Sequence, residues 1–301
     1  MYSWGDDTDD WAKPGTYKFD GKTLAIRAEA AKKAEEAGPR SYGGTGGPNE
    51  QMTNPAKKIS SESPFPLMVA VDVTGSMASW PAEIFDRLPL LYQTLSQYQP
   101  ALEISFAAIG DAGCDRWPLQ VTDFAQGFTL EGTLKALYGE GGGGDAPESY
   151  GVYAWWMNRR VELPAVPPGS QTKPFLIVYG DAPMHEKIPG TQLSKLLGEP
   201  VHDDYDSITE WKKLCQRYSV WFLRRPTGRT NDATEKQWRK AVGAHFLHIH
   251  DEARAIDYAL GIVAWHWGHL EDLRANMLAR QPEAKVNEVL AQVQDLLENR
   301  R

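Results

Sequence analysis

The sequence predicts a doubly wound α/β domain, in which a mostly parallel, six-stranded, Rossmann-like sheet carries helices on both faces. Two observations lead to this fold class. Near-continuous apolar runs such as FPLMVAVDV (65–73) and PFLIVY (174–179) are typical of strands buried on both faces of a parallel sheet. Segments with helical spacing separate the runs, and strands that alternate with helices over about 200 residues build such a sheet.

Each further element follows from a local pattern. A helix is expected over 82–98 because Ile84, Leu88 and Leu91 recur at helical spacing. A short apolar run at 119–124 is expected to be an edge strand. The other predicted strands are 102–109, 218–223 and 244–250, and the other predicted helices are 130–138, 149–161, 207–216, 233–242 and 252–267.

The chain is expected to have three parts, with the α/β domain over residues 64–268. The composition of residues 1–63 predicts a polar arm that is partly disordered. The arm is expected to contain a short helix at 23–37 and a Gly/Pro-rich stretch at 38–48. Aromatic residues are unusual in such an arm, and we expect them to dock on its own domain or on a partner. They are Trp4, Trp11, Tyr17 and Phe19.

Residues 269–301 predict a C-terminal amphipathic helical tail. Its apolar residues recur at the spacing of a single helical stripe: Val286, Val289, Leu290, Val293, Leu296 and Leu297. The stripe could pack against the domain itself or bind a partner helix, and the sequence favours neither.

The composition excludes several classes of function. The formal net charge is −8, and no dense block of Lys or Arg appears, so nucleic acid is a disfavoured partner. Cys114 and Cys215 cannot form a disulfide framework. No signal-peptide pattern is present, and no apolar stretch reaches the roughly 18 residues that cross a membrane. We therefore expect a soluble, cytoplasmic protein with no membrane partner.

Oxygen-bearing side chains follow the predicted strands in three loops. Asp72, Thr74 and Ser76 come after the first strand, Glu148 follows a glycine-rich run, and Asp181 follows PFLIVY. In doubly wound sheets, ligands bind at the carboxyl ends of the strands. Hard divalent cations prefer oxygen ligands, and a shallow site suits Mg²⁺ better than Ca²⁺, with Mn²⁺ as the close competitor.

The motif Asp72-x-Thr74-x-Ser76 at the end of an apolar strand resembles the metal-ion-dependent adhesion site (MIDAS) of von Willebrand factor A-type (VWA) domains. The segments Asp145-Ala-Pro147-Glu148 and PFLIVYG-Asp181-Ala are similar to two loops of the I-like domain of integrin β subunits. The resemblance implies that Asp72, Thr74 and Ser76 are first-loop ligands, Glu148 a second-loop ligand and Asp181 the third-loop carboxylate. It also implies an open coordination position that an acidic side chain of a protein partner fills.

The sequence departs from the family pattern in two places. Glu148 stands where many members have threonine, and this extra carboxylate should weaken the attraction for an anionic ligand. Met77-Ala78-Ser79 replaces the acidic pair that holds an adjacent ion in integrin β subunits, so that second ion is not expected. Asp145 and the Pro147 carbonyl could instead form a flanking ion site.

The leading hypothesis is therefore a metal-dependent protein-interaction module. The resemblance also implies membership of a multi-component complex, with an AAA+ ATPase as the partner. One alternative is a metal-assisted hydrolase in which His185 or Glu148 moves protons. Another is a scaffold in which the metal is only structural. No enzyme activity is expected, because no nucleophile is recognisable and the P-loop-like segment at 15–23 has one residue too many between its glycines.

Other polar clusters are interpreted structurally. Asp111 and Asp115 are expected to form Asx turns. Zinc binding by the histidines of the last strand (His245, His248 and His250) is disfavoured because no cysteine or carboxylate completes a ligand spacing.

Overall fold

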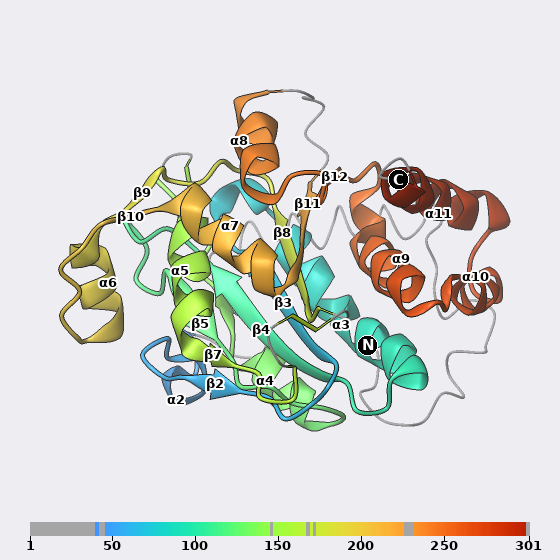
Figure 1. Ribbon diagram of the computed structural model, residues 1–301, viewed down its shortest axis with the longest axis horizontal. Helices are drawn as coiled ribbons and strands as arrows, with labels where there is room; N and C mark the ends of the chain where they lie inside the picture. Colours follow the sequence, from blue (N-terminus) through green and yellow to red (C-terminus); the bar gives the residue numbers. More distant parts are fainter. Residues whose placement is uncertain are drawn as a thin grey trace.

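A six-stranded sheet runs through the centre of the protein (Figure 1). Its strands are β3 (Pro66–Asp72), β4 (Glu103–Ile109), β5 (Leu119–Val121), β8 (Phe175–Gly180), β11 (Ser219–Arg224) and β12 (Phe246–His248). They lie in the order β12-β11-β8-β3-β4-β5, and every neighbouring pair is parallel except β4 with β5. The predicted fold class is confirmed, and β5 is the edge strand that the sequence predicts.

The computed structural model describes residues 40–41, 46–144, 147–166, 169–170, 173–225 and 232–298. Several predictions lie outside the described residues. They concern the arm helix at 23–37, the four arm aromatics, the P-loop-like segment at 15–23, most of the Gly/Pro-rich stretch and Asp145.

Helices cover both faces of the sheet, and the side chains of β3 alternate between them. Val69 and Val71 point into the core on one face of the sheet, whereas Met68 and Ala70 point into the core on the other face. This explains why the strand is apolar at every position. The helices are α3 (Trp80–Tyr98) and α9 (Ala255–Trp267) on one face, and α5 (Tyr150–Arg160), α7 (Ser207–Arg217) and α8 (Ala233–Val242) on the other.

The strand order reverses between β3 and β8, which makes this pair the topological switch point of the sheet. From β3 the chain moves to β4 on one side, and it later crosses back to add β8, β11 and β12 on the other. The loops that leave neighbouring strands then diverge, and a crevice opens at their carboxyl ends. Asp72 ends β3 and Asp181 directly follows β8, so both stand at the carboxyl ends of the switch-point strands.

Some predicted elements have different bounds. The helix predicted over 130–138 is wrong at its end, because α4 (Thr129–Lys135) stops earlier and Tyr138 begins β6 (Tyr138–Gly139). The helix predicted over 252–267 begins as a short 3-10 turn, η2 (Glu252–Arg254), before α9. Residues 182–206, for which no helix or strand is predicted, contain β9 (Lys187–Ile188), α6 (Gly190–Leu197) and β10 (Tyr205–Asp206).

Part of the predicted arm lies against the domain. The short helix α2 (Glu50–Thr53) is followed by β2 (Ile59–Ser60), which pairs in parallel with β7 (Val161–Glu162). Trp156 Nε1 donates a hydrogen bond of 2.6 Å to the carbonyl of Pro55. Upstream, β1 (Arg40–Ser41) pairs with β6.

The C-terminal stripe packs on its own domain. Helices α10 (Leu270–Leu278) and α11 (Glu283–Glu298) lie against α9 (Figure 1). Val286, Val289 and Val293 are buried in the core shared with α9. A Cβ on Gly261 of α9 would lie 3.2 Å from Val293 Cγ2, so the two helices approach closely there. Of the two alternatives for this stripe, the structure therefore supports packing within the chain. No helix among the described residues combines the length and the apolar character needed to cross a bilayer.

Candidate metal centre

The first loop begins where β3 ends, at the fully buried Asp72. Its Oδ1 accepts hydrogen bonds from Thr74 N at 2.9 Å and from Thr74 Oγ1 at 2.6 Å. Gly75 N donates to the carbonyl of Gly142 at 2.6 Å. A Cβ on Gly75 would lie 3.2 Å from the carbonyl oxygens of Gly141 and Gly142. The glycine in this motif therefore lets the first loop touch the glycine-rich second loop.

Hydroxyl groups join the first loop to the third. Ser76 Oγ donates to Asp181 Oδ1 at 2.8 Å and lies 3.4 Å from Thr74 Oγ1. Arg225 Nη1 also donates to the backbone carbonyl of Ser76 at 2.8 Å. The hydrogen-bonded path thus runs from Asp72 through Thr74 and Ser76 to Asp181.

Glu148 completes the group from the second loop. Its backbone is fixed by hydrogen bonds to the segment after β8: Glu148 N donates to the Pro183 carbonyl at 2.9 Å, and His185 N donates to the Glu148 carbonyl at 3.1 Å. Glu148 is 3% exposed, and its side chain lies beside Thr74, because a Cβ on Gly143 would lie 3.0 Å from Glu148 Oε1 and 3.2 Å from Thr74 Cβ. Its Oε2 is buried and has no hydrogen-bond partner among the described residues. The structure therefore brings all five predicted residues together.

Tyr150 belongs to this site, although the sequence analysis does not identify it. Its hydroxyl donates to Asp72 Oδ2, so both oxygens of that aspartate are hydrogen-bonded. The neighbouring Gly180 leaves the space for this contact, because a Cβ there would lie 2.2 Å from the Tyr150 hydroxyl. Asp72 and Tyr150 are far apart in sequence, so no local sequence pattern predicts their contact.

Asp111 is a second residue whose role sequence reasoning missed. Its Oδ1 accepts from Ser149 Oγ at 2.9 Å and lies 2.9 Å from His185 Nε2. Asp115 does not form the predicted Asx turn, because its Oδ2 accepts from Asp111 N at 2.7 Å, four residues earlier in the chain. Asp115 Oδ1 also accepts from Gly143 N at 3.0 Å, which ties this segment to the second loop.

The electrostatics of the site reflect buried carboxyl groups crowded together. Burial raises the pKa of Asp72 to about 7, and the negative charge of Asp181 adds to the rise, whereas hydrogen bonds from Thr74 and Tyr150 oppose it. Burial, together with the charges of Asp72 and Asp111, raises the pKa of Glu148 to about 8. Burial also raises the pKa of Asp181, against the hydrogen bond from Ser76 and the positive charges of Arg225 and Arg224.

Asp111 shows the opposite direction. Burial alone would raise its pKa, but hydrogen bonds from the Gly113 backbone, Ser149, His185 and Cys114 together lower it. Asp111 is thus a carboxylate held charged by its neighbours. The raised pKa values of Asp72 and Glu148 reflect burial first and the charges of neighbouring carboxyl groups second.

The donor set fits a hard divalent cation. It consists only of carboxylate and hydroxyl oxygens, and one buried carboxylate oxygen of Glu148 lacks a partner. Among the described residues, no three His, Cys, Asp or Glu side chains are grouped so as to hold a metal ion by themselves. The hydroxyls of Thr74 and Ser76 would therefore be needed as ligands.

The other sequence-predicted metal candidates have different outcomes. Pro147 is described and partly buried, but Asp145 is not described, so the flanking ion site stays a prediction. His245 Nδ1 lies 2.8 Å from the Val220 carbonyl and its ring stacks on Trp221, which agrees with the structural interpretation of that histidine.

Comparisons with known proteins concern the fold alone. No family model and no curated protein matches this chain. The VWA domain of SpRpn10 matches 65% of this chain and 94% of its own length, at 9% identity and a TM-score of 0.40. A von Willebrand factor type A protein from Catenulispora acidiphila matches 68% of this chain and 43% of its own length, at 15% identity and a TM-score of 0.41.

Proximal thread matrix protein 1 from the mussel byssus matches 72% of this chain at 8% identity and a TM-score of 0.46. This chain spans 49% of that protein and 31% of the pilus adhesin SpaC from Lactobacillus rhamnosus GG, another fold neighbour. VWA domains are thus among the solved structures to which this chain is similar. With TM-scores below 0.5, they carry no argument about the site.

Proposed function

We propose that this chain is a metal-dependent protein-interaction module. Asp72, Thr74, Ser76, Glu148 and Asp181 would hold one divalent cation, Mg²⁺ or Mn²⁺, at the switch point of the sheet. These five residues are called the rim below. The ion would supply a positive charge there, and an acidic side chain of a partner protein would complete its coordination. An AAA+ ATPase as that partner stays a prediction from the resemblance.

One observation carries the proposal. The hydroxyls of Thr74 and Ser76 link the carboxyl groups of Asp72 and Asp181 at the switch point, and a buried oxygen of the neighbouring Glu148 has no hydrogen-bond partner among the described residues. Buried carboxylates are costly unless a cation or hydrogen-bond donors compensate them. A bound divalent cation would offset this cost, and it would favour the ionised forms of Asp72 and Glu148.

The composition of the rim bears on how tightly a partner binds. With Glu148 as well as two aspartates, the ligand set would carry three negative charges around a cation of charge two. The bound ion would then attract an acidic partner less strongly than a site with threonine at this position. We therefore expect that replacing Glu148 by threonine favours the capture of an acidic peptide, provided that the ion is still bound.

Isothermal titration with Mg²⁺ tests the metal site. The wild-type chain should bind about one equivalent, and Asp72→Asn, which keeps the shape of the side chain, should abolish measurable binding. Asp123→Asn is the matched control, because Asp123 is exposed and pairs with Lys57 far from the rim. Equal Mg²⁺ binding by Asp72→Asn and the wild type would remove the site from consideration.

The same proteins separate the alternatives. A structural metal predicts that Asp72→Asn loses Mg²⁺ but still captures every partner that the wild type captures. A metal-assisted hydrolase predicts Mg²⁺-dependent turnover of phosphoester substrates that Asp181→Asn loses. The interaction module predicts partner capture that EDTA abolishes in the wild type, without turnover.

A further inference from the structure

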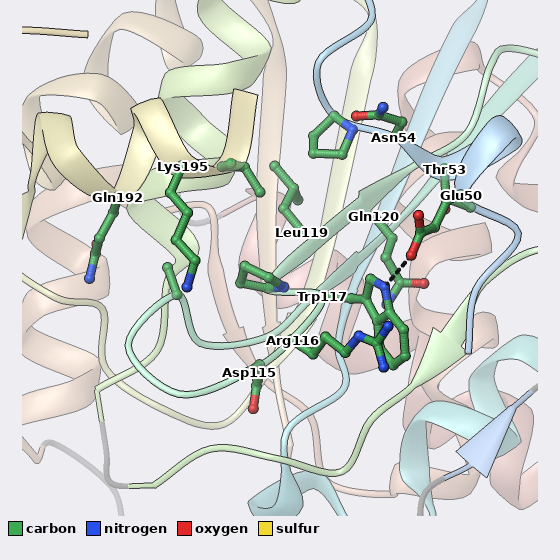
Figure 2. A pocket seen from close by; sticks show the side chains of 14 residues that line it. Glu50, Thr53, Asn54, Asp115, Arg116, Trp117, Leu119, Gln120, Gln192 and Lys195 are labelled. Carbon is green, nitrogen blue, oxygen red and sulfur yellow. Dashed lines mark hydrogen bonds between the residues drawn. The ribbon is translucent and has the colours of Figure 1, made fainter. Parts of the chain in front are cut away.

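A pocket of about 290 Å³ lies between α6, the loop before β5 and α2. Its apolar surface comes from Pro55, Leu119 and Leu196. Figure 2 shows Gln192 and Lys195 extending from α6 along one side, and Trp117 with Glu50 on the opposite side. Asp115 lines the pocket and also bonds to Gly143 N, so the pocket and the metal rim share the turn at 110–118.

The two cations at this pocket have no acidic partner in the described part of the chain. Lys195 and Arg116 are exposed, and no carboxylate among the described residues forms an ion pair with either. The Arg116 guanidinium lies 4.5 Å above the Trp117 ring, which holds it at the pocket edge through a cation–π contact. Both charges therefore stay available to a ligand.

The acids at the same pocket are already engaged. Glu50 Oε1 accepts from Trp117 Nε1 at 2.9 Å (Figure 2). The two oxygens of Asp115 accept from backbone amides of Asp111 and Gly143. In a chain of net charge −8, the pocket thus offers two positive charges that no described carboxylate pairs, beside two carboxylates whose oxygens already accept hydrogen bonds from neutral groups.

We propose that this pocket binds a short linear segment of a partner protein, in which a bulky apolar residue stands next to acidic residues. The apolar side chain enters the pocket against Leu119 and Leu196, and the flanking carboxylates pair with Lys195 and Arg116. The volume supports a side-chain anchor, because it lies just below the range of about 300–1,000 Å³ that small-molecule sites occupy. The residues that flank the apolar side chain are acidic in this proposal because Lys195 and Arg116 carry the opposite charge. This binding needs no metal ion, so it goes beyond the function proposed for the rim.

Fluorescence anisotropy with labelled hexapeptides tests the proposal on the full chain in EDTA. The peptides place Trp, Phe, Leu or Met before either Asp-Asp or Asn-Asn. At least one acidic peptide should bind saturably, and its Asn-Asn counterpart should bind about tenfold more weakly. Lys195→Glu should weaken the acidic peptide about tenfold as well, because attraction becomes repulsion. Lys187→Glu is the matched control, since Lys187 is an exposed lysine on the neighbouring hairpin.

Three results would overturn the proposal. One is that no acidic peptide binds, and another is that Lys195→Glu and Lys187→Glu behave alike. The third is that Trp4→Ser with Trp11→Ser strongly tightens peptide binding, because the chain's own acidic N-terminal residues would then be the occupant instead of a partner. Adding Mg²⁺ should leave the peptide affinity unchanged, and Lys195→Glu should still bind Mg²⁺. Failure at the pocket is therefore distinguishable from failure at the rim.

Discussion

Asp72 and Asp257 are both buried, but their carboxyl groups have different kinds of partners. Asp257 lies in α9, where Arg254 Nη1 stands 3.3 Å from its Oδ2 and Gln281 Nε2 also lies 3.3 Å away. Asp72 lies at the end of β3, where its partners are the hydroxyls of Thr74 and Tyr150 and the Thr74 amide. No cationic side chain among the described residues forms an ion pair with Asp72.

The difference separates a structural role from a binding role. Arg254, Asp257 and Gln281 compensate one another and tie α9 to the turn between α10 and α11. Around Asp72 lie two more carboxyl groups, of Glu148 and Asp181; Arg225 and Arg224 act on Asp181 from a distance, but no described cationic side chain forms an ion pair with any of the three. Buried charge is tolerated where it is paired, and the divalent cation proposed above would pair the charges at the rim.

Removing Arg254 from its buried ion pair with Asp257 should have the largest effect on stability. Arg254→Met leaves the buried Asp257 without its cation, and we expect a loss of about 3–5 kcal/mol in the free energy of unfolding. The loss should be the same in EDTA and in Mg²⁺, because neither residue of the pair is one of the five predicted ligands. Urea unfolding of this variant and of Arg274→Met, an exposed arginine on α10, provides the comparison. A loss as small as that of Arg274→Met would contradict the structural role.

Changing Asp72 should instead have an effect that depends on metal. At a free Mg²⁺ concentration one hundred times its dissociation constant, the wild type should gain about 2.7 kcal/mol of stability. Asp72→Asn should gain nothing from Mg²⁺, and in EDTA it should be at least as stable as the wild type. The asparagine removes a buried negative charge while keeping the contacts with Thr74. A stabilisation of Asp72→Asn by Mg²⁺ equal to that of the wild type would refute the assignment.

The stability of the metal-free protein should fall as the pH rises from about 5 to 8. Burial raises the pKa values of Asp72 to about 7 and of Glu148 to about 8, so the folded chain binds protons more tightly than the unfolded chain in this range. The slope should be on the order of 1 kcal/mol per pH unit for each ionising group. Urea midpoints in EDTA at several pH values measure it, and Asp72→Asn should reduce the slope. A midpoint that rises with pH would argue against crowded carboxyl groups.

The smallest effect is expected at Tyr150. Tyr150→Phe removes the donor to Asp72 Oδ2 and should cost about 1–2 kcal/mol, because hydrogen bonds to a charged group are stronger than neutral ones. It should also raise the pKa of Asp72 further, since the bond from Tyr150 lowers that pKa. Tyr153→Phe, a buried tyrosine one turn along α5, is the control. Equal costs for both would show that the contact with Asp72 contributes nothing.

Much of the site was predictable because it follows strands with strong local signals. The strands β3 and β8 are apolar at nearly every position, since each lies between two layers of helices. Their carboxyl ends then locate Asp72 and Asp181 without any tertiary information. Weak local signals explain the failures: α6 and the hairpin of β9 and β10 have short, mixed patterns that resemble loops.

Sequence alone therefore determined the layered α/β fold and the five oxygen-bearing residues of the rim, because both depend on periodicity and on order along the chain. Only the tertiary structure decided that Tyr150 and Asp111 join them, that Gly75 and Gly180 serve close approach, and that the C-terminal stripe packs on α9. The pocket beside α6 is likewise visible only in the tertiary structure. Such features arise where segments far apart in sequence meet, and no local pattern encodes their distance or their unpaired charge.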